Sequence, residues 1–410
     1  MLSSFTAVDS FSSTNGLTLG IIGGGQLGKM LAFEAKRMFM KLAILDPDEH
    51  CPASTVADNL IVSDFKDEQS IRKLARISDV LTYEIELANS QVLEDLESHD
   101  YPVHPAPRTL NIIQNKLKQK QFLKAEGIPL PDFEPITSRD QLRSTCSEFG
   151  YPLLFKACED SYDGRGNLLI RSEEDIGEGL RHFLGRACMV EKFVPFSKEI
   201  SVMVARSTTG QTESFPVVEN IHDRNILNTT IAPARISVQV AKKAKESAER
   251  AIQSLNGAGI FGVEMFLKKD GDILINEIAP RPHNSGHYSI EACSISQFEQ
   301  HIRAILGLPL TKPRLLSPAV MINILGIDGY SGPYLFSGIK DALEIPGLKL
   351  HFYGKMVTKP QRKLGHMTIT AESIEEALTK AQRARKALIV ESDKHGNTIG
   401  KATSGNNNGK

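Results

Sequence analysis

The stretch from Ile260 to His287, IFGVEMFLKKDGDILINEIAPRPHNSGH, contains two apolar runs joined by a tight turn at residues 269–271, Lys-Asp-Gly. An Asp-Gly turn between such runs predicts a β-hairpin. Counting back from the turn, Glu264 and Glu277 can face each other across the two strands. Two carboxylates on paired apolar strands repel each other unless a cation lies between them. The pattern predicts a Mg²⁺ site, with a salt bridge from one glutamate to a nearby Arg or Lys as the alternative.

A dense polar group follows the second strand of this hairpin. Arg281, His283, Asn284 and His287 lie within seven residues, and KPQRKLGH (359–366) and Lys355 add further cations downstream. Cationic and imidazole side chains without matching acids indicate an anionic ligand, such as a phosphate or bicarbonate. The alternative is that each histidine is structural.

Near the N-terminus, the segment 23–28, GGGQLG, fits the pattern G-x-G-x-x-G between an expected strand and an expected helix. Glycines at this position let the backbone approach a phosphate at a helix N-terminus. Asp46 lies 18 residues beyond Gly28, near the place of a ribose-binding acid in a nicotinamide enzyme. Three interpretations stay open: a dinucleotide site, a phosphate site for another substrate, and close packing of helix on strand.

Two segments in the middle of the chain suit a nucleotide. The strand LLFKA contains Lys156 and precedes the glycine loop 162–167, YDGRGN, whose amides can close over phosphates. The segment 191–194, EKFV, followed by Glu199, can hold an adenine through its backbone and a ribose through the acid. An ordinary hairpin and a surface strand are the respective alternatives.

Composition limits the remaining classes. The chain has 410 residues, a net charge of −1, 41% hydrophobic and 24% charged residues, so it is expected to form two or three globular domains. This charge favours neither nucleic acid nor an anionic membrane. Five cysteines without C-x-x-C spacing fit a reducing cytosol, and no apolar run is long enough to span a membrane. The protein is therefore expected to be cytoplasmic.

Together these motifs resemble the ATP-grasp superfamily and, within it, the 5-(carboxyamino)imidazole ribonucleotide synthase family. The resemblance runs from about Leu17 to Ile389. It rests on the segments GGGQLGKM, YDGRGN, EKFVPFSKEISV, NEIAPRPHNSGH, SISQFEQHIRAILGLPL and PQRKLGH.

The resemblance implies an α/β fold (α+β overall) of three domains. We expect a Rossmann-like preATP-grasp domain at residues 17–115, an ATP-grasp domain at 116–317 and a small C-terminal β-rich domain at 318–390. Residues 1–16 are expected to form a flexible leader, and residues 391–410 a polar tail.

The implied reaction joins bicarbonate to the exocyclic amine of 5-aminoimidazole ribonucleotide, through carboxyphosphate, while ATP is cleaved to ADP and phosphate, in de novo purine biosynthesis. ATP and Mg²⁺, with Mn²⁺ as an alternative metal, are the implied cofactors. Relatives are commonly homodimers, and some eukaryotic ones continue into a mutase domain. The chain stops at Lys410, so mutase activity is expected to be absent and a functional link to a separate mutase is expected instead.

The resemblance also implies residue roles. ATP contacts are implied at Lys116, Lys156, Ser161, Tyr162, Asp163, Gly164, Arg165, Gly166, Asn167, Glu191, Lys192, Phe193, Val194, Glu199, His222, Asn276 and Glu277. Ribonucleotide contacts are implied at Gln26, Glu84, Tyr162, Asn284, Lys355, Arg362 and Lys363. The metal ligands are Glu264 and Glu277, and the catalytic residues are Asp163, Arg165, Arg281 and His283.

Within this set, we expect Arg281 to hold bicarbonate and Asp163 to accept a hydrogen bond or a proton from the amine. The loop around Gly164 and Gly166 is expected to act as a lid that excludes water, because carboxyphosphate is readily hydrolysed. The chain departs from the family at four positions that bear on the lid and local contacts. Asp160 and Ser161 replace usual glycines, Asn167 a common Gln, and Gln361 a common Gly.

Three rival functions remain at this point. Another ATP-grasp ligase, such as the formate-dependent glycinamide ribonucleotide transformylase, would share ATP and Mg²⁺ but need a different acceptor pocket. A nicotinamide-dependent oxidoreductase would use the segment 23–28 but leave Glu264 and Glu277 unexplained. A non-catalytic nucleotide-binding protein is the third.

Overall fold

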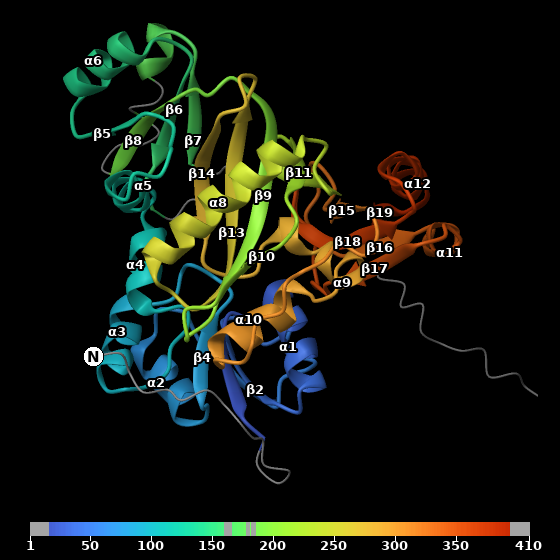
Figure 1. The fold of residues 1–410 in the computed structure, drawn as a ribbon. Coiled ribbons are helices and arrows are strands. Elements are labelled where there is room, and N and C mark those ends of the chain that lie inside the picture. The colour runs from blue at the N-terminus through green and yellow to red at the C-terminus, as the bar shows by residue number, and fades with distance from the viewer. Residues whose placement is uncertain (1–15, 160–165, 178–180, 182–185, 394–410) are drawn as a thin grey trace, which may run out of the picture.

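A computed structural model of the chain describes residues 16–159, 166–177, 181 and 186–393. Figure 1 shows an N-terminal α/β part at the bottom, a long central sheet, a small sheet at the top and a C-terminal part at the right. This arrangement agrees with the predicted mixture of α/β and β-rich domains.

The N-terminal part has the alternating strands and helices of the Rossmann-like domain that the resemblance implies. Its four strands are parallel, in the order β3-β2-β1-β4, and their apolar runs are buried. The strands are β1 (Thr18–Ile22), β2 (Lys41–Asp46), β3 (Asn59–Val62) and β4 (Val80–Tyr83). The helices are α1 (Gln26–Arg37), α2 (Glu68–Arg76), α3 (Ser90–Ser98) and α4 (Pro107–Gln114). The carboxyl ends of β2 and β4 therefore lie on either side of the end of β1, next to the glycine loop.

The small sheet at the top is antiparallel, in the order β5-β8-β6-β7. Its strands are β5 (Phe133–Ile136), β6 (Leu153–Ala157), β7 (Asn167–Ile170) and β8 (Cys188–Lys192). The helical segments are α5 (Lys116–Ala125), α6 (Arg139–Phe149) and the 3₁₀ turn η1 (Glu173–Asp175). Asn115 caps α5 by accepting a hydrogen bond from the Lys118 amide, which fixes where this helix begins.

The central sheet has nine strands, in the order β14-β13-β9-β11-β12-β15-β18-β17, with β10 paired to β9. Its first strands are β9 (Phe196–Arg206), β10 (Thr212–Ser214), β11 (Val218–Asp223), β12 (Ile226–Ala232), β13 (Gly259–Lys268) and β14 (Ile273–Ala279). Helical segments of this part are α8 (Val238–Leu255), η2 (Asn284–Gly286), α9 (Ser289–Ala292) and α10 (Gln297–Ile305). The predicted hairpin is confirmed as β13 and β14.

The C-terminal part continues this same sheet, because β12 pairs with β15 along residues 229–232. Its strands are β15 (Ala319–Leu325), β16 (Tyr334–Ser337), β17 (Leu348–Phe352), β18 (Lys363–Thr370) and β19 (Ile389–Ser392). Its helices are α11 (Ile339–Leu343) and α12 (Ile374–Ala387). The boundary predicted at residue 318 therefore runs through a continuous hydrogen-bonded sheet.

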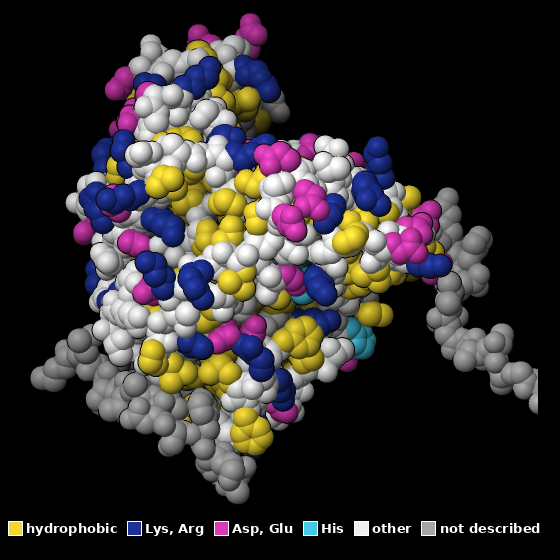
Figure 2. Space-filling model, turned by 45° about the vertical axis from the view of Figure 1, so that its right-hand side comes forward, with side chains coloured by type: hydrophobic (Ala, Val, Ile, Leu, Met, Phe, Trp, Pro, Cys, Tyr) yellow, Lys and Arg dark blue, Asp and Glu magenta, His cyan; other side chains and the backbone are white. Residues whose placement is uncertain are grey.

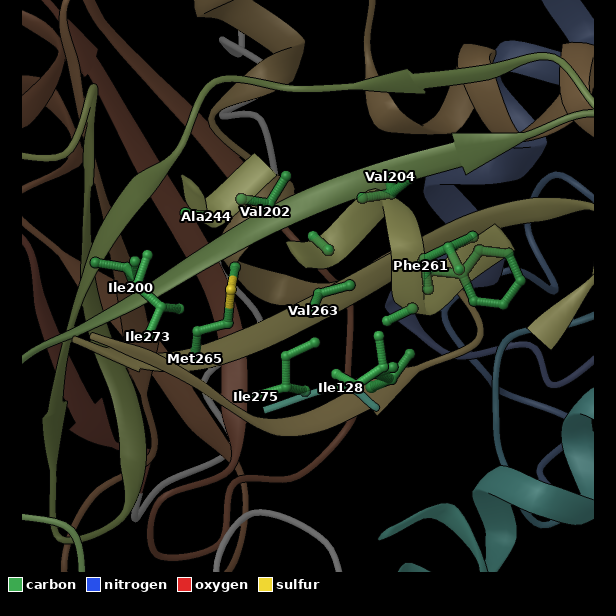
Figure 3. Packing of buried hydrophobic residues seen from close by; sticks show 14 of the residues in the cluster. Ile128, Ile200, Val202, Val204, Ala244, Phe261, Val263, Met265, Ile273 and Ile275 are labelled. Atoms are coloured by element: carbon green, nitrogen blue, oxygen red, sulfur yellow. The ribbon is translucent and has the colours of Figure 1, made fainter. Parts of the chain in front are cut away.

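A buried apolar cluster holds α8 against the sheet. Figure 3 shows aliphatic side chains of β9, β13 and β14 meeting small residues of α8, including Ala244. Alanines spaced along one face of α8 let the helix lie close to the strands, and α8 begins at Ser237, which caps it. This packing makes the end of the hairpin a rigid platform for its polar residues.

The surface agrees with the near-zero net charge. Figure 2 shows acidic and basic side chains interspersed over one face, with small apolar groups between them. None of the helices in the described part of the chain combines the length and the apolar character that crossing a membrane requires.

Candidate active site

One cavity of about 1490 Å³ is lined by residues of the N-terminal part, the small sheet, the central sheet and the C-terminal part. Most of the residues predicted for the site line it, although they come from segments far apart in the sequence. These are Gln26, Glu84, Lys116, Lys156, Asn167, Phe193, Glu199, His222, Glu264, Asn276, Glu277, Arg281, His283, Asn284, Lys355, Arg362 and Lys363.

The two glutamates of the hairpin are direct partners across β13 and β14, as predicted from the turn. An extra residue in β14, Asn276, shifts the register so that Glu277 lies opposite Glu264. Lys116 Nζ lies 2.9 Å from Glu277 Oε2, and His283 Nε2 lies 3.3 Å from Glu264 Oε1. The paired carboxylates thus face an ammonium group and an imidazole within the cavity.

The electrostatics of this pair suit a divalent cation. Burial, together with the neighbouring carboxylate Glu277, raises the pKa of Glu264, although His222 opposes the shift. Burial also acts on Glu277, but Lys116 outweighs it and lowers the pKa of that carboxyl. Mg²⁺ takes one or two carboxylates plus phosphate oxygens and water. In the described residues, no three potential His, Cys, Asp or Glu ligands cluster, so these two carboxylates fit Mg²⁺ better than a closed Zn²⁺ site.

A buried cluster of alternating charge lies beside the pair. Glu191 on β8 receives Lys156 Nζ at 2.9 Å from its Oε1 and Lys120 Nζ at 2.6 Å from its Oε2. Burial disfavours the charged form of Glu191, but Lys156 and Lys120 together lower its pKa to about 2. The side chain of Glu191 is thus committed to two lysines, while Lys156 also lines the cavity.

A further acid–histidine pair lies across the cavity. His222 Nδ1 lies 2.5 Å from Glu199 Oε2, and Asn220 of β11 pairs with Glu199 of β9 in the same sheet. Burial lowers the pKa of His222, but the hydrogen bond to Glu199 outweighs it and the net direction is upward. The pair can present a carboxylate oxygen and an imidazole N–H to a polar ligand.

The glycine loop does not offer its amides to a phosphate. The Gly25 and Gly28 amides donate to the two oxygens of Glu84, and the Gly24 amide donates to Asp46 Oδ2 at 2.7 Å. These carboxylates occupy the N-terminus of α1, where an anionic ligand would bind. The phosphate and dinucleotide interpretations of this loop are therefore wrong for these three amides, and close packing is confirmed.

Close packing also explains why glycines are needed here. A Cβ on Gly28 would lie 2.6 Å from the carbonyl oxygen of Gly23, and one on Gly25 would lie 2.5 Å from Glu84 Oε1. The Glu84 carboxyl accepts hydrogen bonds from the Gly28 and Gly25 amides, but burial outweighs them and raises its pKa to about 7. Glu84 still lines the cavity beside Gln26.

The polar group after β14 faces the same space. Arg281 Nε lies 2.8 Å from Glu86 Oε1, so the guanidinium joins the N-terminal part to the central sheet. Both polar atoms of the Asn284 side chain are buried without a hydrogen-bond partner in the described part of the chain. Such unsatisfied groups are costly, and they fit a position that a polar ligand completes.

His287 has a different environment from its neighbours. It is buried, accepts a hydrogen bond from Gln297 Nε2 at its Nδ1, and stacks on His366 with ring centroids 4.7 Å apart. Burial, reinforced by His351 and His283, lowers its pKa well below the usual range. The structural interpretation of this histidine is the better one.

Several predicted residues lie elsewhere. Ser161, Tyr162, Asp163, Gly164 and Arg165, and with them the predicted lid, lie outside the described residues. Gly166 has a positive φ of 85°, which favours glycine. Lys192 is exposed and Val194 is buried, and neither is among the residues that line the cavity.

Sequence reasoning missed two residues of the site, Lys120 and Glu86. Lys120 lies one helical turn after Lys116, so the i, i+4 spacing was a usable signal. Glu86 lines the cavity but comes from a loop with no motif of its own, whereas Lys359, which also lines it, belongs to the segment 359–366 identified in the sequence.

Comparisons with known proteins agree with this geometry. Family models match at residues 17–114 (ribonucleotide synthetase preATP-grasp domain), 121–298 (ATP-grasp domain) and 319–380 (phosphoribosylaminoimidazole carboxylase C-terminal domain). The small sheet, the carboxylate hairpin and the lysines between them define an ATP-grasp enzyme, an ATP-dependent ligase.

Curated relatives narrow the assignment. The chain is 40% identical to N5-carboxyaminoimidazole ribonucleotide synthase of Bacillus subtilis over 365 residues, covering 88% of this chain and 93% of that protein. It is 43% identical to phosphoribosylaminoimidazole carboxylase of Ogataea methanolica, covering 87% of this chain and 67% of that protein. The chain thus spans nearly all of the bacterial relative and about two thirds of the yeast one.

Solved structures of the same family resemble this chain over nearly its whole length. The synthetase of that name from Thermotoga maritima gives a TM-score of 0.85 at 48% identity, covering 92% of this chain and 100% of the other. The Aspergillus clavatus synthase, solved with ADP and 5-aminoimidazole ribonucleotide, gives 0.84 at 36%, covering 91% and 98%. The chain belongs to the N5-carboxyaminoimidazole ribonucleotide synthase family, which is the family named above as 5-(carboxyamino)imidazole ribonucleotide synthase.

Proposed function

We propose that the chain carboxylates 5-aminoimidazole ribonucleotide with bicarbonate, at the expense of ATP, and forms N5-carboxyaminoimidazole ribonucleotide in purine biosynthesis. The observation that supports it best is that one cavity joins the carboxylate hairpin and its lysines to further polar residues. These further residues include Gln26, Glu84, Lys355, Arg362 and Lys363. The Aspergillus clavatus relative was solved with ADP and 5-aminoimidazole ribonucleotide, which supports a nucleotide and this ribonucleotide as the two ligands.

The nucleotide end of the cavity is assigned to ATP. Lys116 and Lys156 bind phosphate oxygens, since both ammonium groups line the cavity between the small sheet and the hairpin. Glu199 and His222 bind the polar edge of the ribose. Glu264 and Glu277 hold Mg²⁺, with Mn²⁺ as the alternative, and the ion when bound neutralises charge on the triphosphate.

The acceptor end is assigned to the ribonucleotide. Lys355, Arg362 and Lys363 bind its phosphate, because all three cations line the cavity. Asn284 binds a polar group of the substrate with the side-chain amide that has no partner in the described residues. Gln26 and Glu84 complete this end from the N-terminal part.

The chemistry proceeds in three steps. A bicarbonate oxygen attacks the γ-phosphorus, the bond from that phosphorus to the bridging oxygen breaks, and ADP leaves. Carboxyphosphate then breaks its C–O bond and yields CO₂ and phosphate. The exocyclic amine attacks the CO₂ carbon and loses one proton. Arg281 holds the bicarbonate, and Asp163 accepts the proton or hydrogen bond of the amine.

The proposal also requires that water be kept away from carboxyphosphate. The proposal gives the loop around Gly164 and Gly166 the role of a lid and gives Arg165 and His283 roles in catalysis; residues 161–165 lie outside the described part of the chain. Closure protects carboxyphosphate from hydrolysis.

The test is release of ADP with ATP, bicarbonate and 5-aminoimidazole ribonucleotide, leaving out each in turn. We expect ADP release to need all three, and ¹³C-bicarbonate to label the product carbamate. Release that instead requires formate and glycinamide ribonucleotide would assign the chain to the rival ligase.

We also propose that the protein is a cytoplasmic homodimer that passes its product to a mutase. The five cysteines are buried and free, which agrees with a reducing compartment. Phe33 and Phe39 are exposed on the N-terminal part, at 53% and 61%, and suit an interface between copies. Light scattering of the purified protein measures the assembly, and a monomer at micromolar concentration would contradict this part of the proposal.

A further inference from the structure

Helix α5 lies between the two halves of the nucleotide end. Lys116 and Lys120 are four residues apart and therefore on the same face of α5. Lys116 reaches the hairpin at Glu277, whereas Lys120 reaches the small sheet at Glu191. Lys120 Nζ also lies 3.4 Å from the carbonyl oxygen of Asn276, next to Glu277. One helical turn thus contacts both walls of the cleft.

Glu191 is shared between two cations. Lys156 on β6 pairs with Met189 of β8, so Glu191, two residues on, is its diagonal neighbour on the same face. Lys156 takes Oε1 and Lys120 takes Oε2. The exposed fractions of the side chains are 1% for Glu191, 3% for Lys120 and 8% for Lys156, so water does not screen the three charges.

The charge balance of this triad decides what Lys156 can do. Two lysines and one glutamate leave one net positive charge, which is available to an anion that enters the cavity. Without Lys120, a neutral pair would remain, and both oxygens of Glu191 would compete for Lys156. An ammonium group has three donors, and in the triad one of those of Lys156 is used on Glu191.

We propose that Lys120 is a positioning residue for nucleotide binding: it holds one oxygen of Glu191, so that Lys156 keeps charge and donors for the nucleotide phosphates. The inference rests on the proposed function, because it takes Lys156 to bind ATP. It assigns Lys120 no contact with ATP and no part in the chemistry. Through the carbonyl of Asn276, Lys120 also ties the small sheet to the end of the hairpin.

The experiment compares Lys120→Met with Lys120→Arg and with Lys124→Met, an exposed lysine of the same helix. ATP and 5-aminoimidazole ribonucleotide are titrated separately by calorimetry into the full chain. We expect Lys120→Met to weaken ATP binding about tenfold or more and ribonucleotide binding less than about twofold. Lys120→Arg keeps the positive charge, so its ATP affinity should lie between those of the wild type and Lys120→Met. Lys124→Met should bind both ligands with wild-type affinity.

A double variant tests the sharing itself. In Lys120→Met with Glu191→Gln, the neutral amide no longer competes for Lys156, so we expect ATP affinity to recover relative to Lys120→Met alone. A double variant that binds ATP as weakly as the single one would overturn the proposal. Equal loss of both ligands together with a lower melting temperature would reduce Lys120 to a structural residue and overturn it as well.

The outcome is separable from that of the proposed function. Wild-type protein that binds ATP but shows no ribonucleotide-dependent ADP release would refute the carboxylation. The ATP titrations of the single and double variants would still decide the role of Lys120. Unchanged ATP affinity in Lys120→Met would refute the role of Lys120 while leaving the carboxylation intact.

Discussion

Two pairs of carboxylates at strand ends line one cleft and are compensated in opposite ways. Asp46 and Glu84, at the ends of β2 and β4, accept hydrogen bonds from backbone amides of the glycine loop. Glu264 and Glu277, on β13 and β14, face the side chains of His283 and Lys116. Backbone donors are fixed by the fold, whereas side chains can turn away when a metal ion arrives.

The comparison teaches that a motif does not by itself determine which charge it attracts. The segment GGGQLG has the pattern of a phosphate loop, but a carboxylate 56 residues further along the chain occupies the anion position. The hairpin end carries two like charges whose partners are side chains, so a cation is favoured there. The oxygens of the N-terminal pair, Asp46 and Glu84, are occupied by backbone amides, whereas Glu264 and Glu277 can exchange their side-chain partners for a ligand.

The largest expected effect is a loss of ADP release when the hairpin pair, Glu264 and Glu277, is changed. Glu277→Gln removes a carboxylate that the proposal gives to the metal, and we expect ADP release to fall at least about a hundredfold. The fold survives because Gln has the same shape, which the melting temperature checks. Asp272→Asn, on the exposed side of the same hairpin, is the matched control and should keep full activity. Unchanged turnover in Glu277→Gln would refute the assignment of a metal ion to Glu264 and Glu277.

The next effect is a dependence of stability on pH, which should differ between Glu84 in the N-terminal part and Glu191 in the small sheet. Burial raises the pKa of Glu84 from 4.5 to about 7, so its stabilising contribution is present below pH 4.5 and is lost as pH rises through about 7. The stability of wild type relative to Glu84→Gln should fall by roughly 3 kcal/mol over that range. Urea unfolding at several pH values between 5 and 8 measures the part of this loss that lies in that window.

Glu191 supplies the control with the opposite sign. Its two lysines lower the pKa from 4.5 to about 2, so its contribution is present above 4.5 and is lost as pH falls through about 2. The difference between wild type and Glu191→Gln should therefore be flat from pH 5 to 8. The same slope in both variants would show that the two carboxylates do not differ as described.

A smaller effect tests how tightly the N-terminal pair is closed. Gly25→Ala places a Cβ 2.5 Å from Glu84 Oε1, so the carboxylate has to move off the amides. We expect a loss of stability of roughly 2 kcal/mol, as for overpacking of a buried site. Gly177→Ala is the control, because its nearest neighbour would be 3.9 Å away. Equal melting temperatures of the two variants would show that the loop has room.

The smallest effect is an expected zero. NADH should give no saturable shift in melting temperature, because the amides that would bind its pyrophosphate are bonded to Glu84 and Asp46. ATP with Mg²⁺, titrated in parallel, should raise the melting temperature. A saturable NADH shift would reopen the dinucleotide interpretation of the segment 23–28.

Local patterns predicted the hairpin well. A two-residue period and a clear turn place Glu264 near the end of β14, although a plain count from the turn pairs it with Asn276. The extra residue in β14 brings Glu277 into place, and no sequence pattern announces a bulge of that kind. The residue pattern indicated Lys156 and the cations at Lys355 and in the segment 359–366, and the family resemblance added Lys116; the structure places all of these in the cavity.

Long-range contacts were not predictable in the same way. The bonds from the glycine loop to Glu84 and the sharing of Glu191 by Lys120 join residues far apart in the chain. Such partners follow from how the sheets and α5 pack, and packing has no short sequence signature. Lys120 was the nearest miss, since its spacing from Lys116 was visible without its partner.

The pairing of β12 with β15 has a consequence for anyone who cuts the chain. A fragment ending near residue 317 loses every hydrogen-bonded neighbour on that side of β12, from Thr229 to Ala232. A bare strand edge of this kind is a template for aggregation. The C-terminal part is therefore not an independent domain that can be removed. A protein truncated near residue 317 should precipitate rather than act as a minimal enzyme.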